Sequence, residues 1–118
     1  MPEIDKDIEE GKIWAFIGYW GILFLVPLLG KKDNKFAVFH GKQGMVLCIG
    51  AIVVSIVFWI LTFLFGLIHP AIGALFYIIL IIIWLAIVVL GIIGMIKSLT
   101  GDYWKMPIFG DIAEKINI

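Results

Sequence analysis

The stretch Ala71–Ile96, AIGALFYIILIIIWLAIVVLGIIGMI, contains no charged residue and decides the class of fold. A helix rises about 1.5 Å per residue and the hydrocarbon layer of a bilayer is about 30 Å thick, so this stretch can cross a membrane with some tilt. Two further stretches, Ile13–Gly30 and Met45–Ile68, are also free of charge, and the first is just long enough to cross. We therefore predict an all-α membrane protein with three transmembrane helices.

The composition excludes a soluble bundle. The chain has 118 residues, of which 63% are hydrophobic and only 15% are charged, whereas about a quarter of an ordinary soluble domain is charged. A core of this size would leave too little polar surface to cover it. The single cysteine, Cys48, allows no internal disulfide, and the net charge of zero gives no reason to expect nucleic acid as a partner.

The apolar stretches divide the chain into six segments. We predict, in order, an acidic N-terminal segment (1–12), transmembrane helix 1 (13–30), a basic juxtamembrane connector (31–44), transmembrane helix 2 (45–68), transmembrane helix 3 (71–97) and an interfacial tail (98–118). The link His69-Pro70 is so short that the second and third helices should form an antiparallel hairpin. The acidic start lacks the positive charge of a cleavable signal peptide, so we expect the first helix to be retained.

The lysines predict the orientation, because the chain has no arginine. With three crossings, the connector and the tail share one side and carry seven lysines: Lys31, Lys32, Lys35, Lys42, Lys97, Lys105 and Lys115. The other side carries Lys6 and Lys12. Positive charge accumulates on the cytoplasmic face, so we expect a multi-pass protein of the cell membrane with its N-terminus outside and its C-terminus inside.

Two helix starts carry capping signals. Asp33 or Asn34 should cap a helix that continues into transmembrane helix 2, giving that helix an extended cytoplasmic start. Asp111 and Glu114 have the spacing of a capping box, which predicts a short interfacial helix in the tail.

Two segments on the predicted cytoplasmic side have residue choices that hydrophobicity does not explain. These candidate motif and docking residues are Phe36, Phe39, His40, Lys42 and Gln43 in the connector, and Gly101, Asp102, Tyr103, Pro107, Gly110 and Asp111 in the tail. We expect His40 or Lys42 to contact Asp102 or Asp111.

The motifs resemble those of a family of small bacterial and archaeal membrane proteins of unknown function, which is distantly similar to the chloroplast inner-envelope import component of the Tic complex. The resemblance rests on a Phe-rich turn followed by His and Gln, and on a Gly-acidic-aromatic-x-x-Pro-Ile-x-Gly-acidic tail, here 101–111. Gly41 departs from the family pattern, since a larger residue is common there, and the import component is usually drawn with four spans. The resemblance implies the architecture more than an import role.

His40 has three possible uses: structural hydrogen bonding, contact with lipid headgroups, and catalysis or metal binding. His40 and Gln43 are three residues apart on one helical face, which favours hydrogen bonds to a neighbouring helix or to the tail. His69 is expected across the membrane and Cys48 about two turns away, so we predict no metal site and no cofactor. The cytoplasmic lysines could attract anionic headgroups or could simply set the orientation.

The spans carry few polar groups and no ionisable pair of the kind that a pump or coupled transporter requires. Small residues that permit close helix approach are Ala51 and Ser55 in the second span and Gly91 and Gly94 in the third, and they serve either intramolecular packing or self-association. Trp20, Trp59 and Trp84 lie near the middle of each span, where they form a packed aromatic layer or face lipid.

No catalytic motif is visible, so we predict no enzyme. The favoured function is a non-enzymatic membrane module that packs with itself or with partner membrane proteins. The alternative is a small homo-oligomeric channel or a protein-translocation component.

Overall fold

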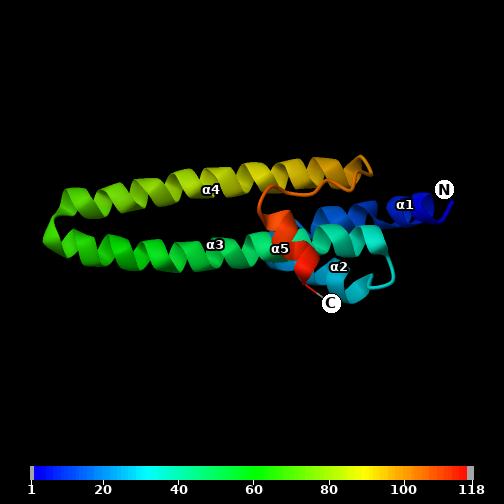
Figure 1. The fold of residues 1–118 in the computed structure, drawn as a ribbon, viewed down its shortest axis with the longest axis horizontal. Coiled ribbons are helices and arrows are strands. Elements are labelled where there is room, and N and C mark those ends of the chain that lie inside the picture. Colours follow the sequence, from blue (N-terminus) through cyan, green and yellow to red (C-terminus); the bar gives the residue numbers. More distant parts are fainter. Residues whose placement is uncertain (1, 117–118) are drawn as a thin grey trace. The chain divides into compact units, whose positions relative to one another are not determined.

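The computed structural model describes residues 2–116, and that part of the chain is helical, with no strand. Its elements are α1 (Pro2–Ile17), a 3-10 helix η1 (Gly21–Phe24), α2 (Leu25–Gly30), α3 (Lys35–Ile68), α4 (Pro70–Leu99) and α5 (Phe109–Lys115) (Figure 1). The chain forms two compact units, each described by itself below: unit 1, residues up to Cys48 and from Leu90 onward, and unit 2, Ile49–Val89. Both α3 and α4 contribute to both units.

Unit 2 is the antiparallel hairpin predicted from the two longest apolar stretches. It takes residues 49–68 from α3 and 70–89 from α4, and each piece is about 30 Å of helix, the thickness of the hydrocarbon layer. The helices approach closely near the turn, because a Cβ atom on Gly73 would lie 2.8 Å from both the Gly66 Cα atom and the Thr62 carbonyl oxygen. Only a glycine fits at this crossing without moving a helix.

The first apolar stretch is not the single transmembrane helix that we predicted for 13–30. Its first five residues, 13–17, form the end of α1. A turn follows, and the residues after the turn form η1 and α2. Gly21 stands in this break with φ at 59°, a backbone conformation that glycine adopts without strain. The described chain therefore has two long apolar helices, α3 and α4, rather than three.

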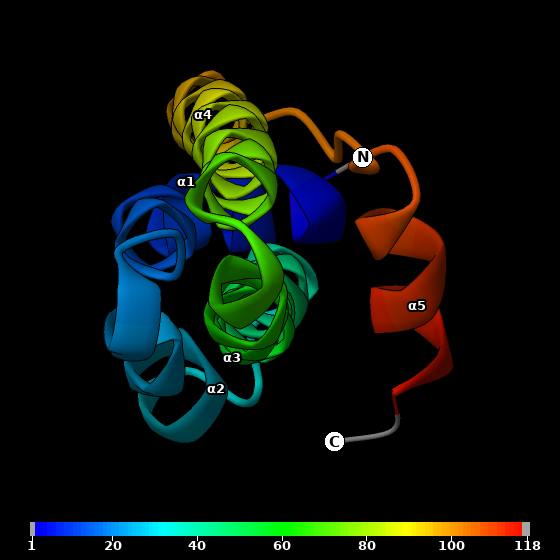
Figure 2. The same ribbon diagram turned by 90° about the vertical axis from the view of Figure 1, so that its left-hand side faces the viewer.

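The extended start predicted for transmembrane helix 2 is confirmed in α3. α3 begins at Lys35, ten residues before the charge-free stretch, and runs without interruption to Ile68 (Figure 1). Asn34 caps it as predicted, since its Oδ1 accepts a hydrogen bond from the Ala37 N–H at 2.9 Å. In unit 1, α2 and α5 lie on opposite sides of the first turns of α3 (Figure 2).

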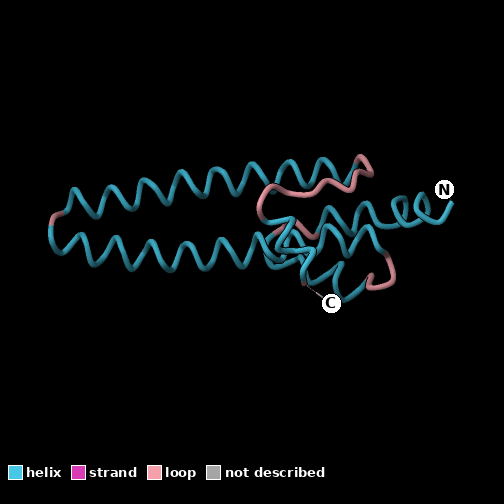
Figure 3. The backbone as a smooth tube through the Cα atoms, viewed as in Figure 1, coloured by secondary structure: helices cyan, strands magenta, loops and turns pink. Residues whose placement is uncertain are grey.

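The tail leaves α4 at Leu99 and turns at Gly101, whose φ is 80°. The loop between α4 and α5 is visible as the long pink segment in Figure 3. The predicted short helix exists as α5, but the predicted capping box is wrong. α5 begins at Phe109, its N-cap residue is Ile108 with φ at 65°, and no side chain caps it.

Candidate functional site

The candidate site of unit 1 is a buried polar cluster of three side chains, Tyr19, His40 and Gln43. α3 positions His40 and Gln43 on one face, and Tyr19 stands in the turn after α1. The Tyr19 hydroxyl lies 2.5 Å from His40 Nδ1, and Gln43 Nε2 donates to the same hydroxyl at 2.8 Å. All three side chains are nearly inaccessible to solvent.

The backbone of the tail completes the cluster. His40 Nε2 lies 2.8 Å from the carbonyl oxygen of Asp102, Gln43 Nε2 donates to the carbonyl oxygen of Trp104 at 3.0 Å, and the Met106 N–H donates to Gln43 Oε1 at 2.7 Å. The tail from 102 to 106 is thus held by two side chains of α3 that are three residues apart. The polar cluster serves as a clamp that ties the tail to α3.

The hydrogen bonds are satisfied by a neutral imidazole. A carbonyl oxygen only accepts, so His40 Nε2 carries the proton that it donates to Asp102. The Tyr19 oxygen accepts from Gln43, which leaves the Tyr19 proton to be donated to His40 Nδ1. A second proton on the ring would leave the Tyr19 proton without its acceptor, so the cluster favours neutral His40 as a structural group.

Aromatic rings surround His40 on the side of α3 that faces the tail. Phe36 and Phe39 meet its ring edge-on at centroid distances of 4.7 and 5.1 Å, and Tyr103 packs edge-on against both phenylalanines. Such edge-to-face contacts stabilise the packing beyond what the burial of the rings alone provides. Burial also raises the pKa of the Tyr103 hydroxyl. The Phe-rich motif is therefore the apolar wall of the clamp.

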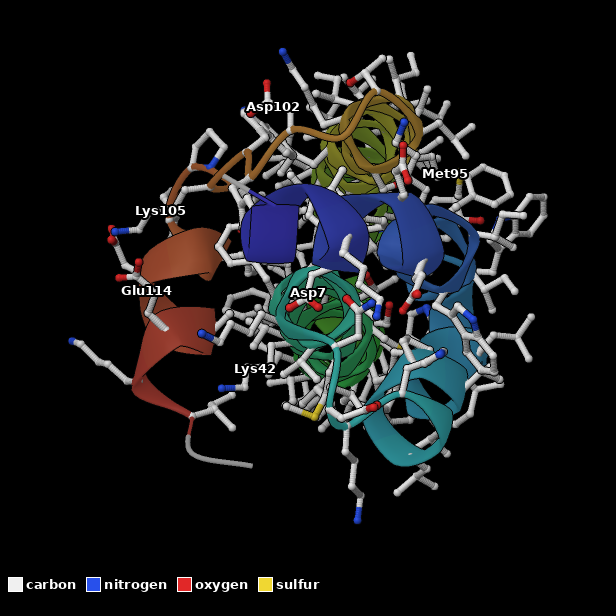
Figure 4. All side chains as sticks on the ribbon, turned by 90° about the vertical axis from the view of Figure 1, so that its right-hand side faces the viewer. Asp7, Lys42, Met95, Asp102, Lys105 and Glu114 are labelled. Carbon is white, nitrogen blue, oxygen red and sulfur yellow. The ribbon has the colours of Figure 1, made fainter. Side chains whose placement is uncertain are left out.

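The predicted contact between the two motifs exists between His40 and Asp102, but it uses the backbone carbonyl of Asp102. The Asp102 carboxylate instead lies 3.4 Å from Lys97 Nζ. Lys42 bonds neither aspartate among the described contacts. Asp111 and Glu114 both bind Lys105 Nζ, at 2.5 and 3.0 Å, instead of capping the helix. Lys105 and Glu114 lie side by side in Figure 4. These hydrogen bonds raise the pKa of Lys105 and lower the pKa of Asp111.

A groove of about 260 Å³ separates α5 from the start of α3. Lys35 and Lys42 line its α3 side together with Val38 and Phe39, and Ala113 and Glu114 line its α5 side. Lys42 reaches from α3 toward α5 in Figure 4. Gly110 lies at the closest point, where a Cβ atom would be 2.9 Å from Gln43 Oε1, so the polar cluster and the groove share one wall.

The small residues predicted for helix packing act within each unit. In unit 2, Ala51 and Ser55 are buried, and the Ser55 hydroxyl accepts a hydrogen bond from Trp84 Nε1 at 2.9 Å. In unit 1, a Cβ atom on Gly94 would lie 2.5 Å from the Tyr19 ring, whereas one on Gly91 would touch Leu47 at 3.7 Å.

The central tryptophans do not form a packed layer. Trp59 and Trp84 are 60% and 42% exposed in the hairpin, and Trp20 is 52% exposed in the turn of unit 1. Trp59, Tyr77 and Trp84 border a wide, mainly apolar groove of about 620 Å³ in unit 2.

The residue that sequence reasoning missed is Tyr19. It lies inside the charge-free stretch Ile13–Gly30, which was predicted as one continuous span, and the signal that could have found it is the neighbouring glycines, Gly18 and Gly21, which interrupt helices. Among residues 2–116, no group of three His, Cys, Asp or Glu side chains is arranged to hold a metal ion.

Two long apolar helices and a small helical unit clamped by polar groups define an α-helical membrane protein. A sequence model of the magnetosome magnetite crystal formation protein family, MamF/MmsF, matches residues 10–113. The chain belongs to this family.

The relatives are named either as UPF0132 membrane proteins or as magnetosome proteins. Two UPF0132 membrane proteins of Methanocaldococcus jannaschii are 30% and 31% identical, each over 95% of this chain and over 70% and 88% of their own lengths. The magnetosome protein MmsF of Paramagnetospirillum magneticum is 27% identical over 88% of this chain and 86% of its own length. No solved structure matches. Membership in a small bacterial and archaeal membrane family is thus confirmed, while similarity to the Tic import component stays a prediction.

Proposed function

We propose that this chain is a non-enzymatic integral membrane protein that holds another protein at the membrane through its unit 1. The observation that carries the proposal is the saturated clamp. Every hydrogen-bonding atom of the His40 and Gln43 side chains has a partner, either the Tyr19 hydroxyl or the backbone of the tail. His40 and Gln43, the side chains whose chemistry drew attention in the sequence, therefore have the structural role of holding the surface of unit 1 together.

The groove between α3 and α5 is the part of that surface best suited to a partner. Lys35 and Lys42 line it on one side, and the apolar side chains of Val38, Phe39 and Ala113 lie between and opposite them. Its one acid, Glu114, is already paired with Lys105. Charge complementarity favours a protein segment that carries both acidic and apolar side chains.

The family supports an organising role at a membrane rather than one particular chemistry. Its description refers to magnetite crystal formation, and the named magnetosome relatives fall within it, yet the archaeal relatives are named only as membrane proteins. A module that positions partner proteins on a membrane is a role that both groups can share, with the partner differing from one organism to another.

The channel alternative gains no support from the hairpin. The groove of unit 2 is lined mainly by isoleucine, leucine, valine and aromatic side chains, and these offer an ion or a polypeptide no polar path.

Quantitative co-purification in native-lipid nanodiscs tests the proposal. The variant Lys42→Glu reverses a charge in the groove, and Lys32→Glu makes the same change at an exposed lysine outside it. We expect a partner recovered with the wild type and with Lys32→Glu, and lost with Lys42→Glu. Equal recovery with both variants, or no protein enriched over empty discs, would reject the groove as a docking site.

A further inference from the structure

Residues 13–30 double back on themselves within unit 1. A continuous helix would separate residues 12 and 31 by roughly 28 Å. Instead, Lys31 Nζ lies 5.8 Å from the centroid of the Trp14 ring, and a Cβ atom on Gly30 would lie 2.9 Å from the same ring. The chain that leaves α1 therefore comes back beside it.

The contact extends beyond residues 13–30 to the polar and charged residues on either side of them. Asn34 Nδ2 donates to the Asp7 carbonyl oxygen at 2.9 Å, and a Cβ atom on Gly11 would lie 2.5 Å from Asn34 Oδ1. The tail joins the same end, since a Cβ atom on Gly101 would meet Ile8 at 2.8 Å and Lys12 at 3.3 Å. The acidic N-terminal segment, the start of α3 and the start of the tail therefore lie together.

The doubled-back segment presents an apolar surface that unit 1 does not cover. Its large exposed side chains are Ile13, Trp20, Ile22, Leu23, Leu25 and Leu29, with Ile13 at 67%, Ile22 at 66% and Leu29 at 65% exposure. In a water-soluble protein such a cluster would mark a contact surface. Here the same chain continues into two helices long enough to cross a bilayer, so lipid is the solvent that this surface meets.

The turn of the segment lies at the level of the first turns of α3. A Cβ atom on Gly44 would overlap the carbonyl oxygen of Gly18, and one on Gly18 would lie 3.2 Å from the Gly41 Cα atom. These positions precede Ile49, where unit 2 begins. The tip of the hairpin is thus beside the residues that lead into the charge-free run, and not beside its middle.

We infer that residues 13–30 form a membrane-embedded helical hairpin that enters one leaflet and returns to the same face, so that the chain crosses the bilayer only twice, through α3 and α4. The partner of its exposed apolar surface is the lipid of that leaflet. The N-terminal segment then shares a side with the connector and the tail.

The lysines fit this arrangement better than three crossings. With two crossings, all nine lysines lie on one side, and the opposite side holds only the His69-Pro70 link, which has none. The positive-inside rule then places both the N-terminal segment and the tail in the cytoplasm. This differs from the orientation predicted from the sequence, which put Lys6 and Lys12 outside.

Single-cysteine labelling separates the two arrangements. In a Cys48→Ser background, cysteines replace the exposed residues Glu9, Asp33, His69 and Lys115, and a membrane-impermeant maleimide is applied to sealed right-side-out and inside-out vesicles. We expect positions 9, 33 and 115 to react from one side and position 69 from the other. Reaction of positions 9 and 33 from opposite sides would overturn the inference. If either variant is not recovered folded, Glu10→Cys or Lys32→Cys takes its place, since both neighbours are also exposed.

A depth measurement provides a second, independent readout. Ile22 would be near the bilayer centre in a continuous 13–30 span, whereas in the hairpin it lies close to the tip of a shallow turn. A nitroxide on Ile22→Cys is compared with one on Trp59→Cys, near the middle of the α3 part of unit 2. We expect the label at position 22 to be more accessible to a polar relaxation agent than the label at position 59. Equal depth at the two positions would contradict the hairpin.

Discussion

Replacing Gln43 by leucine should release the tail from α3 while leaving the hairpin of unit 2 intact. The leucine side chain has a similar size but can neither donate nor accept. It removes three hydrogen bonds, those to the Tyr19 hydroxyl, to the Trp104 carbonyl oxygen and from the Met106 N–H. Gln43 and Met106 are each 1% exposed, so water does not replace the lost partners in the docked state.

The size of the effect follows from these contacts. Two of these bonds join Gln43 to the tail and each contributes about 1 kcal/mol net, so the tail loses about 2 kcal/mol of docking free energy. Every 1.4 kcal/mol is a tenfold change in an equilibrium constant, which makes the undocked state roughly thirtyfold more populated. The unpaired Met106 N–H and Trp104 carbonyl raise the cost further if they stay buried.

Hydrogen exchange of the tail in nanodiscs measures this population directly. The Met106 amide exchanges only when the tail opens, so its protection should fall roughly thirtyfold in Gln43→Leu. Amides of residues 52–66 in the hairpin should keep their protection. Lys32→Gln, at an exposed position outside the cluster, is the control and should change neither. Unaltered Met106 protection in Gln43→Leu would refute the clamp.

Three further outcomes follow from the contacts. Gly44→Ala should destabilise unit 1 by about 1–3 kcal/mol through overlap with the Gly18 carbonyl, while Gly91→Ala, whose Cβ has 3.7 Å of room, should be nearly neutral in thermal unfolding. Trp84→Phe and Ser55→Ala should each cost about 1 kcal/mol, and their double mutant should show coupling, because the two side chains share one hydrogen bond; additive effects would count against that bond. The pKa of Asp111 is lowered in the folded chain, so the stability that its carboxylate gives to α5 is complete above the pKa of the unfolded chain. That stability is lost as the pH falls through the lowered pKa. The protection of the α5 amides against hydrogen exchange should therefore fall only in acid, and Asp111→Asn should remove this pH dependence.

The sequence was sufficient to predict the parts of the fold that depend on composition and on local chemistry. The charge-free runs predicted α3 and α4 because length and apolarity alone decide whether a helix can cross a bilayer. A cap at Asp33 or Asn34 was predicted because the capping bond joins residues two or three apart, and Asn34 is the residue that makes it. The shared face of His40 and Gln43 followed from helical periodicity, and both side chains do turn toward the tail.

The partners of these side chains were beyond local reasoning. His40 binds the backbone of a residue sixty-two positions away, and a backbone carbonyl leaves no mark in the identity of that residue. The aspartate motif drew attention to the carboxylate of Asp102, which in fact faces Lys97. In the same way, Asp111 and Glu114 have the spacing of a capping box, but a nearby lysine competes for both acids.

The first apolar stretch shows why apolarity alone does not determine a crossing. Hydropathy measures how apolar a segment is, and it does not distinguish one long helix from a hairpin of two short apolar helices. The difference lies in whether the backbone can turn, and here Gly21 adopts the positive φ of the turn while Gly18, Gly41 and Gly44 let the turn approach α3. Tyr19, held between those glycines, then reaches His40 and Gln43, so the same break that prevents a third long helix also supplies the third member of the clamp.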